Sequence, residues 1–277
     1  GIPLLTMKFL FYSPHALTDS SSGAARSVSA LLAELVALGH DAFAVTGTIA
    51  DQDNQLLARL LALPAADVLE VPEVAIKRDL RKVRINGVEH CVVCFDSNKV
   101  LSLLAVEEAL LAQVFRQVFD EFQPHVVLTF GGFSSNYLAG FYARDNGSQA
   151  VLYAATHNYV DASHFNHVDK VVTPSVALRR LLDTVSTKPK LALSSLVRRE
   201  DVLCRTREPE FITFINPTLS KGLMLILTLA RECQKQHRPY RFLVVESRGT
   251  RATLQPFAGQ LSELNNLMIG SNTADVR

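Results

Sequence analysis

A lysine stands between a strand-like run and a helix-like run in the stretch FINPTLSKGLMLILTLARE, residues 214–232. The apolar start breaks at Asn216 and Pro217, and Lys221 and Gly222 precede residues with helical spacing. The ammonium of a lysine at such a turn can neutralise a diphosphate as a point charge. A solvated lysine at an ordinary helix start explains the same residues, and the stretch matches no P-loop pattern.

The stretch SPHALTDSSSGAARS, residues 13–27, follows the first strand candidate and is rich in small polar residues. It contains His15, Ser22 and Gly23. The free N–H groups and the dipole of a helix N-terminus favour an anion, so a diphosphate could dock at Ser22 and Gly23. A flexible loop with serine caps is the alternative. The glycine patterns of a dinucleotide fingerprint and of a P-loop are both absent.

Two further loops follow strand candidates and carry residues suited to ligand binding. TFGGFSSN contains Gly131 and Gly132, which let a backbone approach a ligand closely or simply make a tight turn. AATHNYV contains His157 and Asn158, and a histidine at a strand end could donate to a sugar hydroxyl. A structural or merely exposed histidine is the alternative.

Metal-binding and redox patterns are weak. Cys91 and Cys94 form a C-x-x-C, but EHCVVCF is typical of a strand, in which residues three apart point to opposite faces. No second C-x-x-C completes a zinc set. The histidines and the aspartate of HNYVDASHFNHVD do not share one helix face, which leaves zinc as a minority interpretation. We therefore expect no metal and no cofactor.

The composition is that of an ordinary globular protein. The 277 residues are 48% hydrophobic and 20% charged, with a formal net charge of +1. This balance gives no electrostatic case for nucleic acid or a membrane as the main partner. No apolar run reaches transmembrane length, and nothing in the cysteine pattern requires an oxidising compartment. We expect a cytoplasmic protein.

Strand-like and helix-like runs alternate along the chain, which predicts an α/β fold with doubly wound parallel sheets. Asn86-Gly87 is the strongest hairpin signal, and Gly39 is a good helix C-cap. Ligand sites on such sheets lie beyond the carboxyl ends of the strands. The expected strands are residues 8–12, 41–47, 125–130, 149–155, 170–174, 211–215, 240–247 and 266–271. The expected helices are residues 24–38, 53–63, 106–122, 135–146, 175–183, 222–232 and 254–264.

A charged, proline-terminated stretch, residues 196–210, indicates a domain boundary. We expect a first domain over residues 7–206 and a second over residues 207–277. The second domain offers three strands before the sequence stops, so we expect it to be incomplete.

Taken in order, these pieces resemble the retaining GT-B glycosyltransferases of the large family four. The similarity spans most of residues 8–271. It is carried by the motifs FLFYSPHALTDSSSGAARSVSALLAELVALGHDAFAVTG, FQPHVVLTFGG, ATHN, DKVVTPSVALRRLL and FITFINPTLSKGLMLILTLARE.

This resemblance implies a nucleotide-sugar donor held between two Rossmann-like domains, with the acceptor mainly on the first. Gly23 and its neighbours would approach donor phosphate or acceptor, with His15, Gly131, Gly132 and Asn158 on the acceptor side. The resemblance gives His157 and Lys221 catalytic roles: His157 would hydrogen-bond near the transferred sugar, and Lys221 would stabilise the leaving diphosphate. Such enzymes usually need no metal, and retention is likewise a property of the family.

The sequence departs from the family in two places. Asn216 stands where an arginine is usual, five residues before Lys221, so only half of a basic pair is present. The family's E-x7-E segment is absent from this sequence. A non-catalytic GT-B-like binding module, which needs a partner chain or self-association, is therefore the alternative to a glycosyltransferase. A nucleotide-dependent sugar epimerase is a further one, although the carboxylates it needs cannot be identified.

Overall fold

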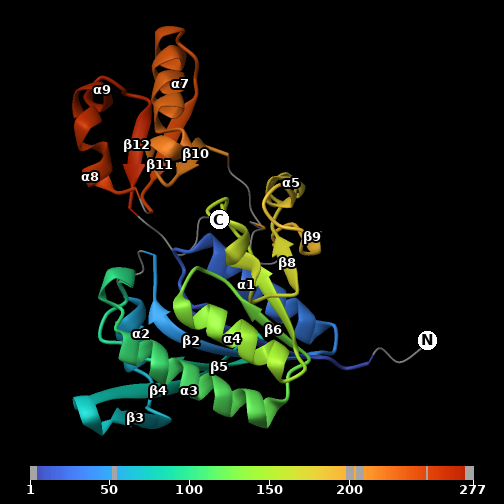
Figure 1. The fold of residues 1–277 in the computed structure, drawn as a ribbon. Helices are drawn as coiled ribbons and strands as arrows, with labels where there is room; N and C mark the ends of the chain where they lie inside the picture. The colour runs from blue at the N-terminus through green and yellow to red at the C-terminus, as the bar shows by residue number, and fades with distance from the viewer. Residues whose placement is uncertain (1–4, 52–54, 198–202, 204–208, 248, 272–277) are drawn as a thin grey trace. The chain divides into compact units, whose positions relative to one another are not determined.

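The computed structural model describes residues 5–51, 55–197, 203, 209–247 and 249–271 (Figure 1). Contacts divide the chain into two compact units, residues 1–197 and residues 198–277. The domain boundary expected at residue 206 falls among residues outside the described ranges.

The first unit is built on one nine-stranded sheet in the order β3-β4-β5-β2-β1-β6-β7-β8-β9. Its pairings are parallel except that β4 runs antiparallel to both β3 and β5. The strands are β1 (Lys8–His15), β2 (Asp41–Ile49), β3 (Asp67–Val71), β4 (Ile76–Ile85), β5 (Val88–Val93), β6 (Val126–Thr129), β7 (Gln149–Tyr153), β8 (Lys170–Thr173) and β9 (Lys190–Ala192).

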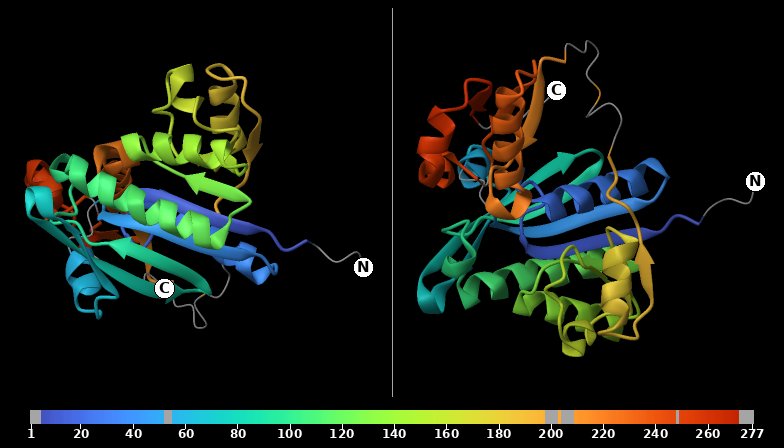
Figure 2. Two further views of the ribbon diagram at one scale, coloured as in Figure 1. Left: turned by 60° about the horizontal axis from the view of Figure 1, so that its bottom comes forward. Right: turned by 90° about the horizontal axis from the view of Figure 1, so that it is seen from above.

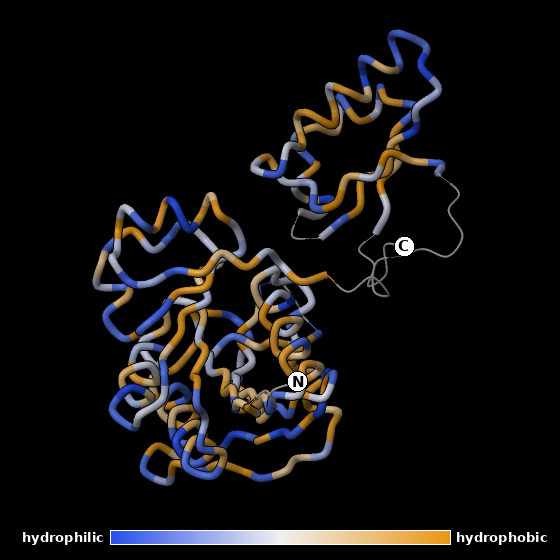
Figure 3. Tube along the Cα trace, turned by 90° about the vertical axis from the view of Figure 1, so that its right-hand side faces the viewer, coloured by the Kyte–Doolittle hydropathy of each residue, from blue (hydrophilic) through white to orange (hydrophobic). Residues whose placement is uncertain are grey.

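Helices cover both faces of this sheet, as a doubly wound fold requires. Helix α1 packs on one face, and α3 and α4 pack on the other (Figure 2). The hydrophobic stretches in Figure 3 run along the strands between these layers. The α-helices of the unit are α1 (Gly23–Ala37), α2 (Leu56–Leu61), α3 (Ala105–Phe122), α4 (Ser134–Asp145) and α5 (Val176–Asp183). Within the described residues, no helix combines the length and apolarity needed to cross a membrane.

Local sequence signals set several of these boundaries. The Ser22 hydroxyl caps α1 by accepting from the Ala25 N–H, and Gly39, with φ of +88°, follows the end of the helix. Asn86 and Gly87 have φ of +50° and +82° and join β4 to β5. Both signs are those of a type I′ turn, so the predicted hairpin is confirmed.

The second unit holds a three-stranded parallel sheet in the order β10-β11-β12. Its own core forms where the buried face of α7 meets the sheet. Its strands and α-helices are β10 (Phe211–Ile215), α7 (Leu223–Lys235), β11 (Arg241–Val245), α8 (Arg251–Leu254), α9 (Ala258–Ser262) and β12 (Leu267–Gly270). The fold is thus α/β with two Rossmann-like sheets, the first mostly parallel and the second wholly parallel, in agreement with the predicted fold class.

The helix expected over residues 254–264 is broken in the structure. A 3₁₀ turn, Gln255–Phe257, separates α8 from α9. Pro256 causes the break because it lacks a backbone N–H and its ring clashes with the preceding turn of an α-helix.

Candidate functional site

The strand order places a topological switch point between β1 and β6. From β1 the chain winds outward to β2 and β5, whereas β6 returns to the other side of β1 and continues to β7 and β8. The Ser13 hydroxyl joins the two strand ends by donating to the Phe130 carbonyl at 3.1 Å. Ligands of open α/β sheets bind at such a switch point, outside the carboxyl ends of the strands.

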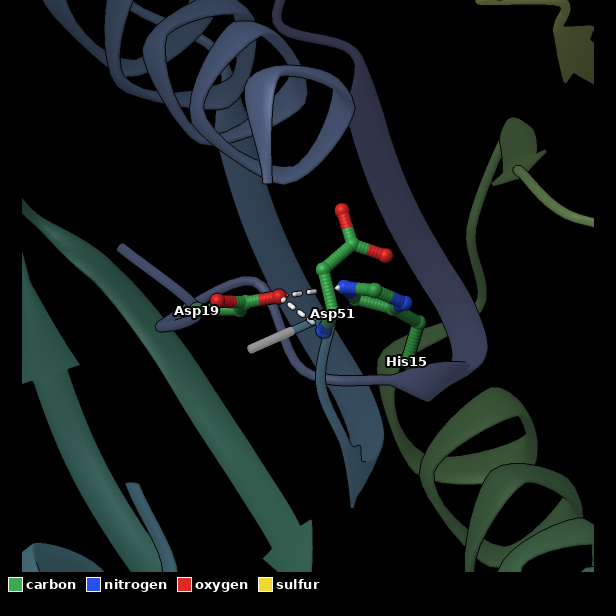
Figure 4. A group of neighbouring side chains, drawn as sticks. All are labelled: His15, Asp19 and Asp51. Carbon is green, nitrogen blue, oxygen red and sulfur yellow. Dashed lines mark hydrogen bonds and ion pairs between the residues drawn. The ribbon is translucent and has the colours of Figure 1, made fainter. Parts of the chain in front are cut away.

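His15, the last residue of β1, forms a buried pair with Asp19 in the loop that follows. The His15 Nε2 lies 2.9 Å from Asp19 Oδ2 (Figure 4). The same oxygen accepts from the Asp51 N–H at 2.7 Å, and Oδ1 accepts from the Ser21 N–H and hydroxyl at 2.8 and 2.5 Å. Asp19 is fully buried. Its donors lie at the end of β1, in the loop after β1 and in the loop after β2.

Asp19 is held as a carboxylate. Burial by itself would raise the pKa of Asp19, but the hydrogen bonds from His15 and Ser21 outweigh it and lower that pKa below its usual value. The ionised Asp19 accepts a hydrogen bond from the Nε2–H of His15. In a neutral His15 ring this hydrogen bond sets the tautomer, with the proton on Nε2 and with Nδ1 as the hydrogen-bond acceptor.

His15, Asp19 and Asp51 form the one group of potential metal ligands in the part of the chain that the structure describes. Their ligand atoms lie within 4.8 Å of one another. However, each Asp19 oxygen already accepts from two donors, which suits a hydrogen-bonded carboxylate better than a metal ligand.

The histidines of residues 157–167 do not gather into such a group. His167 is buried, with its ring 4.3 Å from that of Tyr137 between centroids. His164 Nδ1 lies 3.0 Å from the Asp161 carbonyl, and His157 is exposed.

The two glycines after β6 differ in their surroundings. Gly131 has φ of +92°, a left-handed conformation that favours glycine, and a Cβ there would lie 3.1 Å from the Phe133 ring. Gly132 faces open space. The buried amide of Asn136 fixes the turn by donating to the Phe130 carbonyl at 2.7 Å and to the Gly131 carbonyl at 3.3 Å.

Tyr159 connects this turn to the loop after β7. Burial raises the pKa of Tyr159 to about 12, and the backbone N–H of Gly131 beside the hydroxyl acts in the opposite direction. His157 and Asn158 precede Tyr159 and are exposed. The end of β1, the Gly131 turn and the loop bearing His157 therefore lie along one edge of the sheet.

In the loop of residues 13–27, where the sequence predicts phosphate binding, only some of the hydrogen-bond donors are free to bind a ligand. Ser22 caps α1 and is 3% exposed, and the Ser21 donors serve Asp19. Gly23 faces open space, and its N–H has no partner among the described residues. The anionic Asp19 in the same loop opposes a second anion, so any phosphate here would depend on the start of α1.

In the second unit, Lys221 ends a 3₁₀ turn and is exposed, and its ammonium makes no hydrogen bond or ion pair within the described ranges. Asn216 adopts φ of +69°, a conformation that asparagine tolerates. Its side-chain oxygen accepts from the Gly249 N–H at 2.8 Å, and its own N–H donates to Val245 at 3.0 Å. Asn216 thus ties the loop after β10 to the loop after β11.

Sequence reasoning selected His15 and the Gly131 turn but missed Asp19 and Tyr159. Asp19 stands four residues after His15, and this spacing within an irregular loop carries no periodic signal. Tyr159 directly follows the selected His157 and Asn158, and its burial could not be read from that loop.

No protein-family model and no curated protein matches the sequence. Solved structures do match the fold. The catalytic domain of starch synthase IV from Arabidopsis thaliana, bound to ADP and acarbose, is 9% identical with a TM-score of 0.61, over 97% of this chain and 74% of that one. A Staphylococcus aureus TarM mutant, in complex with fondaparinux, α-GlcNAc-glycerol and UDP, is 12% identical with a TM-score of 0.56, over 97% and 78%.

A third match is the UDP-GlcNAc 2-epimerase from Neisseria meningitidis bound to UDP-GlcNAc. It is 11% identical with a TM-score of 0.55, over 97% of this chain and 72% of that one. At these identities the likenesses establish the fold alone. The two Rossmann-like units of the present chain have the GT-B type of fold.

Proposed function

We propose that this chain is a glycosyltransferase that moves a sugar, with retention, from a nucleotide-sugar donor to an acceptor hydroxyl. The observation that carries the proposal is the His15–Asp19 pair at the switch point of a GT-B-type sheet. Two of the matched structures contain a nucleotide together with a carbohydrate, which supports the same substrate class.

The first unit would bind the acceptor. In the neutral ring, His15 Nδ1 would accept a hydrogen bond from the acceptor hydroxyl, because the Nε2–H donates to Asp19. The open space at Gly132 lets the backbone approach the acceptor closely. His157 and Asn158 would donate to sugar hydroxyls from the neighbouring loop.

The second unit would bind the donor. Lys221 would pair with the diphosphate and stabilise the charge that develops on it as the sugar leaves. Asn216, whose amide oxygen holds Gly249, would shape the turn that presents Lys221. On the first unit, the N–H of Gly23, with Ser22 as helix cap, is a separate candidate for binding phosphate. The proposed chemistry uses these groups without a resident cofactor.

Calorimetric titration with UDP, GDP and ADP tests the donor site. We expect one of them to bind and Lys221→Gln to weaken that binding about tenfold, because a charge-assisted hydrogen bond to phosphate is lost. Lys235→Gln is the matched control, since Lys235 is exposed on α7 and pairs with Glu232 at 3.0 Å. Absence of binding by all three nucleotides, or equal affinities of the two variants, contradicts the proposal.

A non-catalytic binding module that acts with a partner chain or by self-association is the second candidate. The observation that favours it is the hydrogen bond from the Gly249 N–H to the Asn216 side chain. Asn216 stands where the resemblance to the glycosyltransferases implies an arginine. Sugar transfer or sugar-nucleotide turnover by the purified chain eliminates this candidate, and loss of that turnover in His15→Ala would place His15 in the reaction.

A further inference from the structure

A cavity of 490 Å³ opens on the first unit at the edge of the sheet opposite to His15. Its walls are the end of α1 with His40, the start of β2, the second half of β4, the first half of β5 and the second half of α3. The strands of the switch point end at the other edge, so this cavity is separate from the site described above. Its volume lies in the range of ligand pockets, which is about 300–1,000 Å³.

The floor of the cavity is apolar. Leu80, Cys91 and Val118 line it and are 8%, 2% and 8% exposed. Cys91 is a free cysteine, and burial raises the pKa of its thiol, so the sulfur is uncharged at neutral pH. Val114 and Phe43 extend this surface along α3 and β2. Such a floor gains free energy when an apolar ring or chain covers it.

The rim carries charges whose pairing is incomplete. On the face of the β4–β5 hairpin that lines the cavity, Arg84 lies opposite Glu89 and forms an ion pair with it at 3.9 Å. Lys82 lies opposite Cys91, so its cross-strand neighbour is a thiol in place of a carboxylate. Within the described ranges the Lys82 ammonium has no hydrogen bond or ion pair. In an antiparallel pair of strands, a carboxylate directly opposite a lysine would stabilise it, and here that position is Cys91.

Two further carboxylates, Glu121 and Asp41, lie on the rim together with His40. Glu121 accepts from the neutral Gln117 amide at 3.1 Å, and its charge, like that of Glu89, adds to the effect of burial on the pKa of the Cys91 thiol. Asp41 lies four residues along β2 from Val45, the residue that pairs with Cys91. Four residues of strand span about 13 Å, so Asp41 stands at the far end from Lys82.

We propose that this cavity binds a small amphiphile that combines an apolar ring or chain with one anionic group. The anion pairs with Lys82, and the apolar part covers Cys91 and Val118. The volume limits the ligand to a compact molecule, and Lys82, which lies opposite a thiol and not a carboxylate, is the cation for its anionic group. The proposal is independent of the reaction proposed above, because none of its residues belongs to that site.

A pair of dyes tests the charge preference. Anilinonaphthalene sulfonate carries one anionic group, and N-phenylnaphthylamine has the same rings without it. We expect the anionic dye to bind once per chain and Lys82→Gln to weaken its binding about three- to fivefold, with the neutral dye unaffected. Lys99→Gln, at an exposed lysine outside the cavity, is the control.

A second pair of variants tests the location. Gln117→Trp narrows the mouth of the cavity, whereas Gln113→Trp places the same ring one turn earlier on the exposed face of α3. We expect only Gln117→Trp to reduce binding of both dyes. Equal effects within either pair of variants overturn the proposal. Lys82, an exposed residue of β4, would then be an ordinary solvated lysine.

Discussion

The Asp19 carboxylate is the residue on which the geometry of the site depends. It accepts hydrogen bonds from His15, from Ser21 and from the Asp51 N–H, all within a fully buried position. We predict that Asp19→Ala lowers the free energy of unfolding by about 3 kcal/mol, since buried donors lose their acceptor. Urea unfolding of the chain measures this loss.

Asp161 supplies the matched control for this prediction. It accepts from the Ser163 N–H at 2.8 Å, as Asp19 accepts from Ser21 two residues on, but Asp161 is exposed. Water replaces an exposed acceptor, so we expect Asp161→Ala to have little effect. A loss of stability as large for Asp161→Ala as for Asp19→Ala would mean that burial of the network is unimportant.

The sequence could point to individual site residues only where backbone geometry demands a residue type. Gly131 was selectable because glycine is favoured at positive φ. The partnership of His15 with Asp19 was not, because it depends on how the loop after β1 folds back toward the end of that strand. Asn216 was selected as a donor-binding residue, and the structure shows its amide oxygen held by the Gly249 N–H. A sequence reveals the residue type but not its partner.

At the scale of elements, buried apolar runs were predictable and polar ones were not. β1, β6 and β7 are almost wholly buried runs, and the hairpin turn has its own residue code. β3 is mostly exposed, and β9 has only three residues within a lysine-rich stretch. Neither strand has an apolar run or an alternation of apolar and polar residues, which are the sequence signals of a strand. Both are strands because they pair with β4 and β8 in the sheet.

Helix α4 packs closely against His167 at the position of Gly140. A Cβ at Gly140 would lie 2.5 Å from the His167 carbonyl oxygen and 2.7 Å from its ring. Because the nearest atom belongs to the backbone, the helix would have to move. We predict that Gly140→Ala destabilises the chain by about 2 kcal/mol, in spite of the better helix propensity of alanine.

Gly23→Ala is the control for Gly140→Ala. Gly23 is the first residue of α1, and a Cβ there meets nothing within 4 Å. Thermal unfolding should show a lowered midpoint for Gly140→Ala and an unchanged or slightly raised one for Gly23→Ala. A Gly140→Ala chain as stable as the parent would show that α4 is free to shift away from His167.

At the scale of the whole molecule, the two units differ in how acid should affect them. His90 and His167 both lie in the first unit and are 3% and 2% exposed. Burial lowers the pKa of each to about 4, and nearby Arg144 and Lys188 add to the effect at His167. The second unit contains one histidine, His237, which is exposed. Acid sensitivity from buried histidine therefore belongs to the first unit.

The sign of this dependence follows from the lowered pKa values. The unfolded chain binds protons at these histidines as the pH falls through about 6.5, whereas the folded chain does not until about pH 4. Stability of the first unit is therefore full above that range, falls as the pH decreases through it, and levels off below it. Each histidine accounts for about 3 kcal/mol of this loss.

We predict that replacing both histidines by leucine, His90→Leu with His167→Leu, makes the stability of the first unit less dependent on pH in this window. Urea unfolding from about pH 7 to about pH 4.5, compared between parent and double variant, isolates the histidines from the titration of carboxylates. His237→Leu, in the second unit, should leave the slope as it is. A double variant that loses as much stability as the parent between these pH values would show that both rings are already charged in the folded chain.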